Sequence, residues 1–170
     1  LQRTHRPRAM NLTGIGYDVH PFADGRRLVL GGVEIPHHRG LAGHSDADVL
    51  CHAIADALLG AVGEPDIGYW FPPSEASIEG ISSLLILAKA AERVAALGGR
   101  IENIDSTLIA EAPKVMPHVP AMKAAMAAAL GMEPQAIGIK ATTNERMGFV
   151  GREEGIAALA VVSVALPEMA

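Results

Sequence analysis

Two side chains suited to metal binding stand two residues apart near the start of the chain. Asp18 and His20 lie in a segment that reads as a strand, and side chains two apart on a strand leave the same face. His52, in the helical segment that follows, can supply a third ligand. Three such ligands with a fourth position open to a substrate oxygen are typical of catalytic rather than structural zinc. By itself, however, an Asp-x-His pair is explained as simply by ordinary surface or hydrogen-bonding residues.

Two acidic residues flank His52 at helical spacing. Asp48 and Asp56 stand four residues before and after it, so either carboxylate could orient the imidazole ring. A solvated polar stripe explains the same spacing equally well. The neighbouring Cys51 points about 100° away from His52 on a helix, which indicates a small buried apolar residue.

His44 and Ser45 precede the same helical segment. Unpaired backbone N–H groups and the helix dipole favour an anion at such a point, so a phosphate group would fit there. The alternative explanation is that Ser45 caps the helix while His44 is exposed. Residues 45–48 also have the form of a capping box, with an acid three residues after the serine.

Two loops in the C-terminal half combine groups that suit a nucleotide. Residues 140–152, KATTNERMGFVGR, leave an expected strand. They suit a diphosphate with magnesium, because Glu145 offers a hard oxygen ligand while Thr142 and Thr143 can donate to phosphate oxygens. Residues 110–116, AEAPKVM, could hold a planar base against small residues and backbone amides. A plain proline-containing loop has the same composition.

The elements that must position these groups alternate along the chain. Five strands are expected, over residues 12–20, 28–35, 101–110, 137–142 and 156–166. The first two would form an N-terminal hairpin around a turn at residues 23–25. Three helices are expected, over residues 45–62, 82–97 and 121–130, the last two ending at glycines.

The last expected strand, residues 156–166, is apolar on both faces, whereas a half-exposed strand would alternate. Something must therefore cover both of its sides. We expect a single α/β (α+β) domain in which a mixed four-stranded sheet and the N-terminal hairpin carry three helices on one face. Partner subunits of a homo-oligomer would cover the other face.

Composition limits the class of protein. With 170 residues, 49% of them hydrophobic, the chain suits one domain, and its net charge of -5 argues against a nucleic-acid partner. It contains neither a membrane-length apolar run nor a signal-peptide pattern. Cys51, the single cysteine, excludes an intrachain disulfide. We expect a soluble, cytoplasmic protein with a domain at residues 12–170 and a flexible basic segment at residues 1–11.

Six separated motifs occur in a characteristic order. They are GYDVH (16–20), GHSDADV (43–49), His52 with DALLG (56–60), DIG (66–68), APK (112–114), and KATT (140–143) with GF (148–149). In order and spacing, over residues 13–167, the chain resembles the 2-C-methyl-D-erythritol 2,4-cyclodiphosphate synthase family. Six motifs in order are far more specific than any one of them, so the resemblance favours the metal-site interpretation.

The resemblance also implies roles for particular residues. Asp18, His20 and His52 would bind Zn²⁺ or another divalent cation, and Glu145 would hold Mg²⁺ or Mn²⁺ bridging the substrate diphosphate. The implied catalytic residues are His44, Asp66 and Thr143. The implied substrate contacts are Asp18, His20, His44, Ser45, Asp66, Ile67, Gly68, Ala110, Glu111, Ala112, Pro113, Lys114, Val115, Met116, Lys140, Thr142, Thr143, Asn144, Glu145, Phe149 and Arg152.

The family's reaction is intramolecular. The 2-phosphate of 4-diphosphocytidyl-2-C-methyl-D-erythritol 2-phosphate attacks the β-phosphorus, CMP leaves, and a cyclic diphosphate of the non-mevalonate isoprenoid pathway forms. By resemblance, the chain would be such a phosphorus-oxygen lyase, active as a homotrimer with sites between subunits. Phe149, Arg152 and Glu154 would surround a central cavity that accepts isoprenoid diphosphates. One departure is FPPSE at residues 71–75, where family members commonly read FPDTD, so contacts of that loop are not carried over.

Two other functions use the same residues. A zinc phosphohydrolase would place water in the open coordination position, and analysis of the products separates it from a synthase. A non-catalytic module that binds a cytidine nucleotide or an isoprenoid diphosphate would need no turnover. The intact set of expected metal and phosphate ligands argues against that module.

Overall fold

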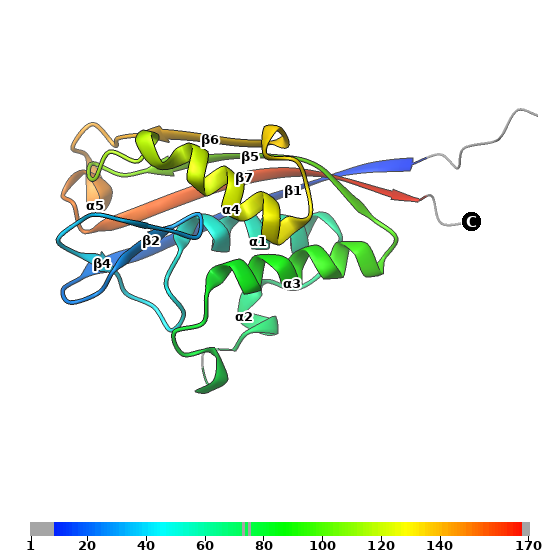
Figure 1. Ribbon diagram of the computed structural model, residues 1–170, viewed down its shortest axis with the longest axis horizontal. Helices are drawn as coiled ribbons and strands as arrows, with labels where there is room; N and C mark the ends of the chain where they lie inside the picture. Colours follow the sequence, from blue (N-terminus) through cyan, green and yellow to red (C-terminus); the bar gives the residue numbers. More distant parts are fainter. Residues whose placement is uncertain (1–8, 73, 75, 168–170) are drawn as a thin grey trace, which may run out of the picture.

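The computed structural model describes residues 9–72, 74 and 76–167, and its centre is one mixed sheet (Figure 1). The sheet has five strands in the order β4-β1-β7-β5-β6, not the expected four. β1 runs antiparallel to β7, β7 antiparallel to β5, and β5 parallel to β6. The strands are β1 (Ala9–Ala23), β4 (Gly40–Leu41), β5 (Arg100–Ile109), β6 (Ile137–Thr142) and β7 (Gly155–Pro167). Since β1 begins at Ala9, residues 9–11 belong to the sheet, and residues 1–8 lie outside the described part.

The expected N-terminal hairpin is wrong. β1 pairs with β7 and β4, while residues 28–35 form a hairpin of their own, β2 (Leu28–Leu30) with β3 (Val33–Ile35). β2 and β3 pair with each other because a tight turn joins them at Gly31 and Gly32, whose φ angles of +58° and +76° favour glycine. One expected strand is therefore two short strands in a separate two-stranded sheet.

Three main helices lie on one side of the five-stranded sheet, as expected (Figure 1). α1 packs against β1 and β7, and α3 packs against α1 and α4. The main helices are α1 (Val49–Ala61), α3 (Ser83–Ala96) and α4 (Val119–Leu130). The shorter helices are α2 (Ile67–Trp70), α5 (Gly148–Gly151) and the 3-10 turns η1 (Ala76–Ile78), η2 (Met116–His118) and η3 (Pro134–Ala136). No helix in the described part of the chain has both the length and the apolar character needed to cross a bilayer.

α1 begins later than the capping-box interpretation places it. Its N-cap is Asp48, not Ser45, and the Asp48 carboxylate accepts the backbone N–H of Cys51 at 3.1 Å. The same buried carboxylate accepts the N–H groups of Gly31 at 2.9 Å and Gly32 at 2.7 Å. Three donors converge on one side chain, so Asp48 ties the start of α1 to the β2–β3 turn.

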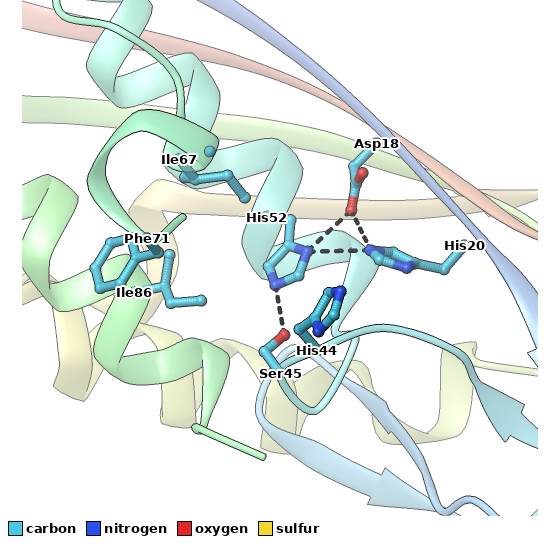
Figure 2. Close-up of a pocket in the computed structure, with 9 residues that line it drawn as sticks. Asp18, His20, His44, Ser45, His52, Ile67, Phe71 and Ile86 are labelled. Atoms are coloured by element: carbon cyan, nitrogen blue, oxygen red, sulfur yellow. Dashed lines mark hydrogen bonds and ion pairs between the residues drawn. The ribbon is translucent and has the colours of Figure 1, made fainter. Parts of the chain in front are cut away.

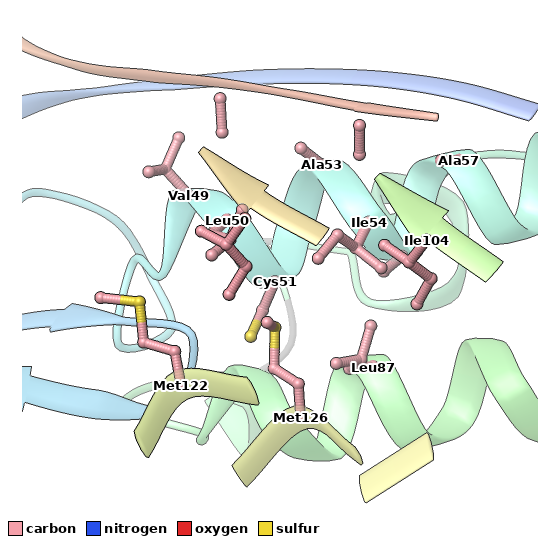
Figure 3. Packing of buried hydrophobic residues seen from close by; sticks show 14 of the residues in the cluster. Val49, Leu50, Cys51, Ala53, Ile54, Ala57, Leu87, Ile104, Met122 and Met126 are labelled. Carbon is pink, nitrogen blue, oxygen red and sulfur yellow. The ribbon is translucent and has the colours of Figure 1, made fainter. Parts of the chain in front are cut away.

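The core lies between the helices and the sheet (Figure 3). Leu50 and Ile54 of α1 meet Leu87 of α3 and Met122 of α4, all of them fully or almost fully buried. Cys51 is buried in this cluster as predicted. Burial raises the pKa of its thiol well above the usual value, which makes it an unreactive apolar residue.

The opposite face of the sheet is apolar and uncovered in the single chain. Ile15 and Tyr17 of β1 are 72% and 52% exposed, and Leu159 and Val161 of β7 are 42% and 45% exposed. These residues alternate with buried ones on the helix side of the same strands. Contiguous apolar faces of this kind usually mark an interaction surface.

Candidate active site

The site begins with an unusually close approach of α1 to β1. Gly14 and Gly16 share the helix-facing side of β1 with Asp18 and His20. A Cβ atom at Gly16 would lie 1.8 Å from the carbonyl oxygen of Ala53, and one at Gly14 would lie 1.8 Å from that of Ala57. Only glycine lets the helix backbone rest directly on the strand here, which brings His52 within reach of Asp18 and His20. In the sequence, Gly14 and Gly16 on one strand face and the alanines at 53 and 57 on one helix face indicate this close contact, which was not predicted.

The three predicted metal ligands lie together, as Figure 2 shows. The Asp18 Oδ2 atom is 3.0 Å from His20 Nε2 and 3.1 Å from His52 Nδ1. The two histidine nitrogens are 3.2 Å apart. In a tetrahedral zinc site with bonds of about 2.0–2.1 Å, neighbouring ligand atoms are about 3.3 Å apart. The spacing therefore fits a divalent ion.

The protonation of His20 supports the same fit. Its Nδ1 atom lies 2.6 Å from the carbonyl oxygen of Ala42, which can only accept, so Nδ1 carries the hydrogen and Nε2 presents a lone pair to the cluster. Burial lowers the His20 pKa, but the hydrogen bond and charge of Asp18 outweigh it and raise the pKa above 6.5. Burial alone would raise the pKa of Asp18, but its hydrogen bonds with His20 and His52 outweigh burial and lower that pKa to about 2. The cluster thus favours a positive charge, whether a proton or a metal ion.

A cavity of about 200 Å³ opens beside the three ligands. His44 and Ser45 line it, as do Ile67 and Gly68, so the structure brings together the residues predicted to hold the phosphate and the sugar alcohol. Phe71, in the loop whose contacts were not carried over, and Ile86, for which no role was expected, add an apolar wall. Asp66 is not among the described residues that line this cavity. Its carboxylate caps α2 by accepting the Tyr69 N–H at 3.1 Å.

Neither of the two acids that helical spacing offered as partners for His52 forms a hydrogen bond with its ring. The Asp48 carboxylate caps α1, and the Asp56 carboxylate accepts the N–H of Ile67 at 2.9 Å, which fixes the start of α2. The His52 Nε2 atom instead faces two hydroxyl groups, Ser83 Oγ at 2.9 Å and Ser45 Oγ at 3.1 Å. Ser83 begins α3 and lies 31 residues from His52 in the chain, so helical spacing could not identify it.

A second cavity, of about 500 Å³, lies at the C-terminal ends of the parallel strands β5 and β6. The two predicted nucleotide loops meet there, because neighbouring parallel strands end at the same edge of a sheet. Glu111 fastens one loop to the other, since its Oε1 atom accepts the N–H groups of Asn144 and Arg146, each at 3.0 Å. The lining residues are Ala110, Glu111, Pro113, Lys114, Val115, Met116, Pro117, Ala141, Thr142 and Thr143.

A family model described as the YgbB family matches residues 12–165 of the chain. The chain belongs to the YgbB family. A 2-C-methyl-D-erythritol 2,4-cyclodiphosphate synthase of Akkermansia muciniphila is 63% identical over 158 residues, which are 92% of this chain and 94% of that protein.

Two solved structures resemble this chain closely. A structure of a 2C-methyl-D-erythritol-2,4-cyclodiphosphate synthase in a CDP-bound form has a TM-score of 0.82 and 33% identity, covering 89% of this chain and 99% of that one. The bifunctional IspDF of Campylobacter jejuni has a TM-score of 0.90 and 39% identity, covering 94% of this chain and 43% of the longer one. The mixed α+β single-domain fold is therefore the fold of these synthases.

In this YgbB family member the two cavities have no described lining residue in common. Several other predicted contacts lie outside both linings. Lys140 pairs with Asp105 on the open face of the sheet, and Arg152 pairs with Glu154 through Nε at 2.6 Å. Phe149, in α5, is 39% exposed. A single chain therefore holds the cavity beside Asp18, His20 and His52 and the cavity at the ends of β5 and β6 as separate parts.

Proposed function

We propose that this chain converts 4-diphosphocytidyl-2-C-methyl-D-erythritol 2-phosphate to 2-C-methyl-D-erythritol 2,4-cyclodiphosphate and releases CMP. It would act as a phosphorus-oxygen lyase of the non-mevalonate isoprenoid pathway. The observation that carries the proposal is the cluster of Asp18, His20 and His52 beside a cavity lined by His44 and Ser45. That cluster stands in a chain 63% identical to a named synthase.

Asp18, His20 and His52 would hold Zn²⁺, or another divalent cation, through Oδ2, Nε2 and Nδ1. When bound, the ion supplies Lewis-acid stabilisation of the charge that develops on the phosphate oxygens. His44 and Ser45 line the adjacent cavity and would bind the β-phosphate of the substrate with an imidazole and a hydroxyl group. These donors strengthen their interaction as charge develops on the phosphate, which is what accelerates the step.

The remaining parts of the substrate would occupy the walls of the first cavity and the second cavity. Ile67 and Gly68 would contact the methylerythritol portion through the backbone at the start of α2, with Asp66 binding its hydroxyl groups. Residues 110–116 would hold the cytosine, as the family resemblance implies, and the related synthase structure in a CDP-bound form supports a cytidine nucleotide as the ligand. Thr143 would bind the β-phosphate from the side opposite His44, and Glu145 would hold Mg²⁺ or Mn²⁺ on the diphosphate.

No external nucleophile is needed, because the substrate's own 2-phosphate attacks. The chain's task is to position that phosphate in line with the leaving CMP and to exclude water, which would give a hydrolysis product. The apolar side chains of Phe71 and Ile86 face the cavity and would limit the water that reaches the β-phosphorus.

We further propose that the active form is a homotrimer. Two features support it: the uncovered apolar sheet face formed by Ile15, Tyr17, Leu159 and Val161, and the separation of the two cavities within one chain. Packing subunits through the apolar face would bring the nucleotide cavity of one chain beside the metal cavity of the next. Phe149, Arg152 and Glu154 would then surround a central cavity able to bind an isoprenoid diphosphate.

Phosphorus-31 NMR of the reaction mixture tests the proposed activity. The purified protein, supplied with Zn²⁺ and Mg²⁺, should convert the cytidylylated 2-phosphate substrate to CMP and a cyclic diphosphate. The His52→Ala variant should give neither product. A linear phosphate together with a cytidine nucleotide as the main products would overturn the synthase and favour the phosphohydrolase.

A further inference from the structure

A series of hydrogen bonds runs from His52 through buried Ser83 to half-buried Asp46, on the side of the ring away from the other two metal ligands. The His52 Nε2 atom lies 2.9 Å from Ser83 Oγ, and Ser83 is completely buried at the start of α3. The Asp46 carboxylate accepts a hydrogen bond from the Ser83 hydroxyl group. It also accepts the Ser83 backbone N–H at 3.0 Å.

The donors and acceptors of Asp46, Ser83 and His52 allow one arrangement of the hydrogen atoms between them. An ionised carboxylate can only accept, so the single Ser83 hydroxyl hydrogen points to Asp46. Toward His52 the Ser83 oxygen can then only accept, so the His52 Nε2 atom must carry a hydrogen. A neutral imidazole with its hydrogen on Nε2 presents a lone pair at Nδ1. Nδ1 is the atom that lies 3.1 Å from Asp18 Oδ2 and 3.2 Å from His20 Nε2.

Without the hydrogen bonds from Asp46 through Ser83, the His52 tautomer with its hydrogen on Nδ1 would be favoured. Asp18 Oδ2, at 3.1 Å from His52 Nδ1, is an acceptor that would draw the hydrogen to Nδ1. A hydrogen at Nδ1 would block the ligand atom. Asp46 and Ser83 therefore oppose the pull of the metal-binding carboxylate itself.

Asp46 is well placed to hold this arrangement. Its backbone N–H donates to the Ile81 carbonyl at 3.0 Å, and its Oδ1 atom accepts the Asp48 N–H at 3.2 Å. The Gly80 N–H donates to the His44 carbonyl at 2.7 Å. The segment of residues 44–46 is thus fastened to the start of α3, and the start of α3 is fastened to His52.

We propose that Asp46 and Ser83 are positioning residues that hold His52 in the Nε2–H tautomer and direct its Nδ1 atom to the metal. The inference rests on the proposed function, because it takes Asp18, His20 and His52 as metal ligands.

The same arrangement has a consequence for the hydroxyl hydrogen of Ser45. Since His52 Nε2 carries a hydrogen, the Ser45 hydroxyl hydrogen cannot go to it. That hydrogen is available to Ser83 Oγ at 3.5 Å or to a phosphate oxygen in the cavity.

Nitrogen-15 NMR of the metal-free protein reads the tautomer directly. In the wild type at mildly alkaline pH, His52 should show its hydrogen on Nε2. In Ser83→Ala the hydrogen should move largely to Nδ1, and in Asp46→Asn, where the amide can reverse the hydrogen bond, the same change should occur in part. Unchanged Nε2–H in both variants would overturn the proposal.

Zinc affinity, measured by competition with a chromogenic chelator, is the second readout. Ser83→Ala should bind Zn²⁺ about 10–100-fold more weakly than the wild type. The matched control is Ser82→Ala, which removes the exposed N-cap hydroxyl of the same helix, bonded to the Leu84 N–H at 3.3 Å. It should lower the Tm while leaving zinc affinity within about twofold. Equal zinc affinities for Ser83→Ala and Ser82→Ala would contradict the positioning role.

The outcomes separate this inference from the proposed function. If the wild type bound no Zn²⁺ at this cluster, the metal site on which the inference rests would be wrong. If Zn²⁺ bound with the expected dependence on Ser83 but the reaction gave linear products, the positioning role would stand and the synthase proposal would fail.

Discussion

Replacing Gly16 with alanine tests how the fold positions the three candidate metal ligands. The backbone at Gly16 is outside the left-handed region, so alanine can adopt it and steric contact decides the outcome. The added Cβ would lie 1.8 Å from the Ala53 carbonyl oxygen, whereas real Cβ atoms essentially never come closer than 3.0 Å to such an atom. The strand and α1 must therefore separate by at least the difference, 1.2 Å.

That separation should lower both stability and metal binding. Overpacking of this kind costs about 1–3 kcal/mol, which corresponds to a fall in Tm of roughly 2–12 °C for a domain of this size. His52 precedes Ala53 in α1 and moves with it. Because ligand distances tolerate only about 0.2 Å, we expect Gly16→Ala to weaken zinc binding by at least about tenfold.

The matched control is Gly60→Ala in the same helix. There the added Cβ would meet only the Ile15 carbonyl oxygen, at 4.0 Å, so alanine should stabilise α1 by about 0.5–1 kcal/mol and leave zinc binding unchanged. Both variants are compared with the wild type by denaturant unfolding in the presence of a chelator and by zinc competition titration. Wild-type stability and zinc affinity in Gly16→Ala would refute the idea that the glycine contact positions the site.

Three further predictions concern the metal, the diphosphate and the assembly. The pKa of His20 is raised above 6.5, so zinc affinity should fall as the pH drops through that pKa and a proton takes the place of the metal ion. In the metal-free chain, protonation of His20 stabilises the fold. That stability is present below pH 6.5 and is lost as the pH rises through the His20 pKa. An affinity that does not change between about pH 8 and pH 6 would contradict this in the same titration. Thr143→Ala and Glu145→Ala should lower turnover about 100-fold with wild-type zinc content by elemental analysis, and a parallel loss of zinc would show that their role is wrong. Leu159→Lys, which places a charge on the apolar sheet face, should reduce the mass found by light scattering from a trimer to a monomer, whereas a wild-type monomer would contradict the assembly.

The cluster of candidate metal ligands could be predicted because part of its signal is local. A spacing of two on a strand placed Asp18 and His20 on one face, and the structure confirms that His52 joins them from the helix. Long runs of regular pattern were also informative: β6 has the expected bounds, and β5 and β7 begin and end within one residue of them.

What the sequence analysis missed depends on contacts between distant segments. Residues 12–20 and 28–35 were expected to pair because they are neighbours in the chain, whereas β1 pairs with β7 at the other end. Helical spacing offered two acids as partners for His52, but its ring contacts Ser83, which donates its hydroxyl hydrogen to Asp46. Spacing within one element cannot reveal such contacts, since the packing of α1 against β1 and α3 decides them.

The origin of the oxygen atoms in the products tests most directly whether the protein cyclises its substrate by intramolecular attack. The reaction is run in oxygen-18 water with the Zn²⁺- and Mg²⁺-supplied protein, and both products are analysed by mass spectrometry. Intramolecular attack by the 2-phosphate forms the new phosphorus-oxygen bond from an oxygen already in the substrate, so neither CMP nor the cyclic diphosphate should carry label. Label in CMP or in a linear phosphate as the main product would contradict cyclisation and identify water as the nucleophile.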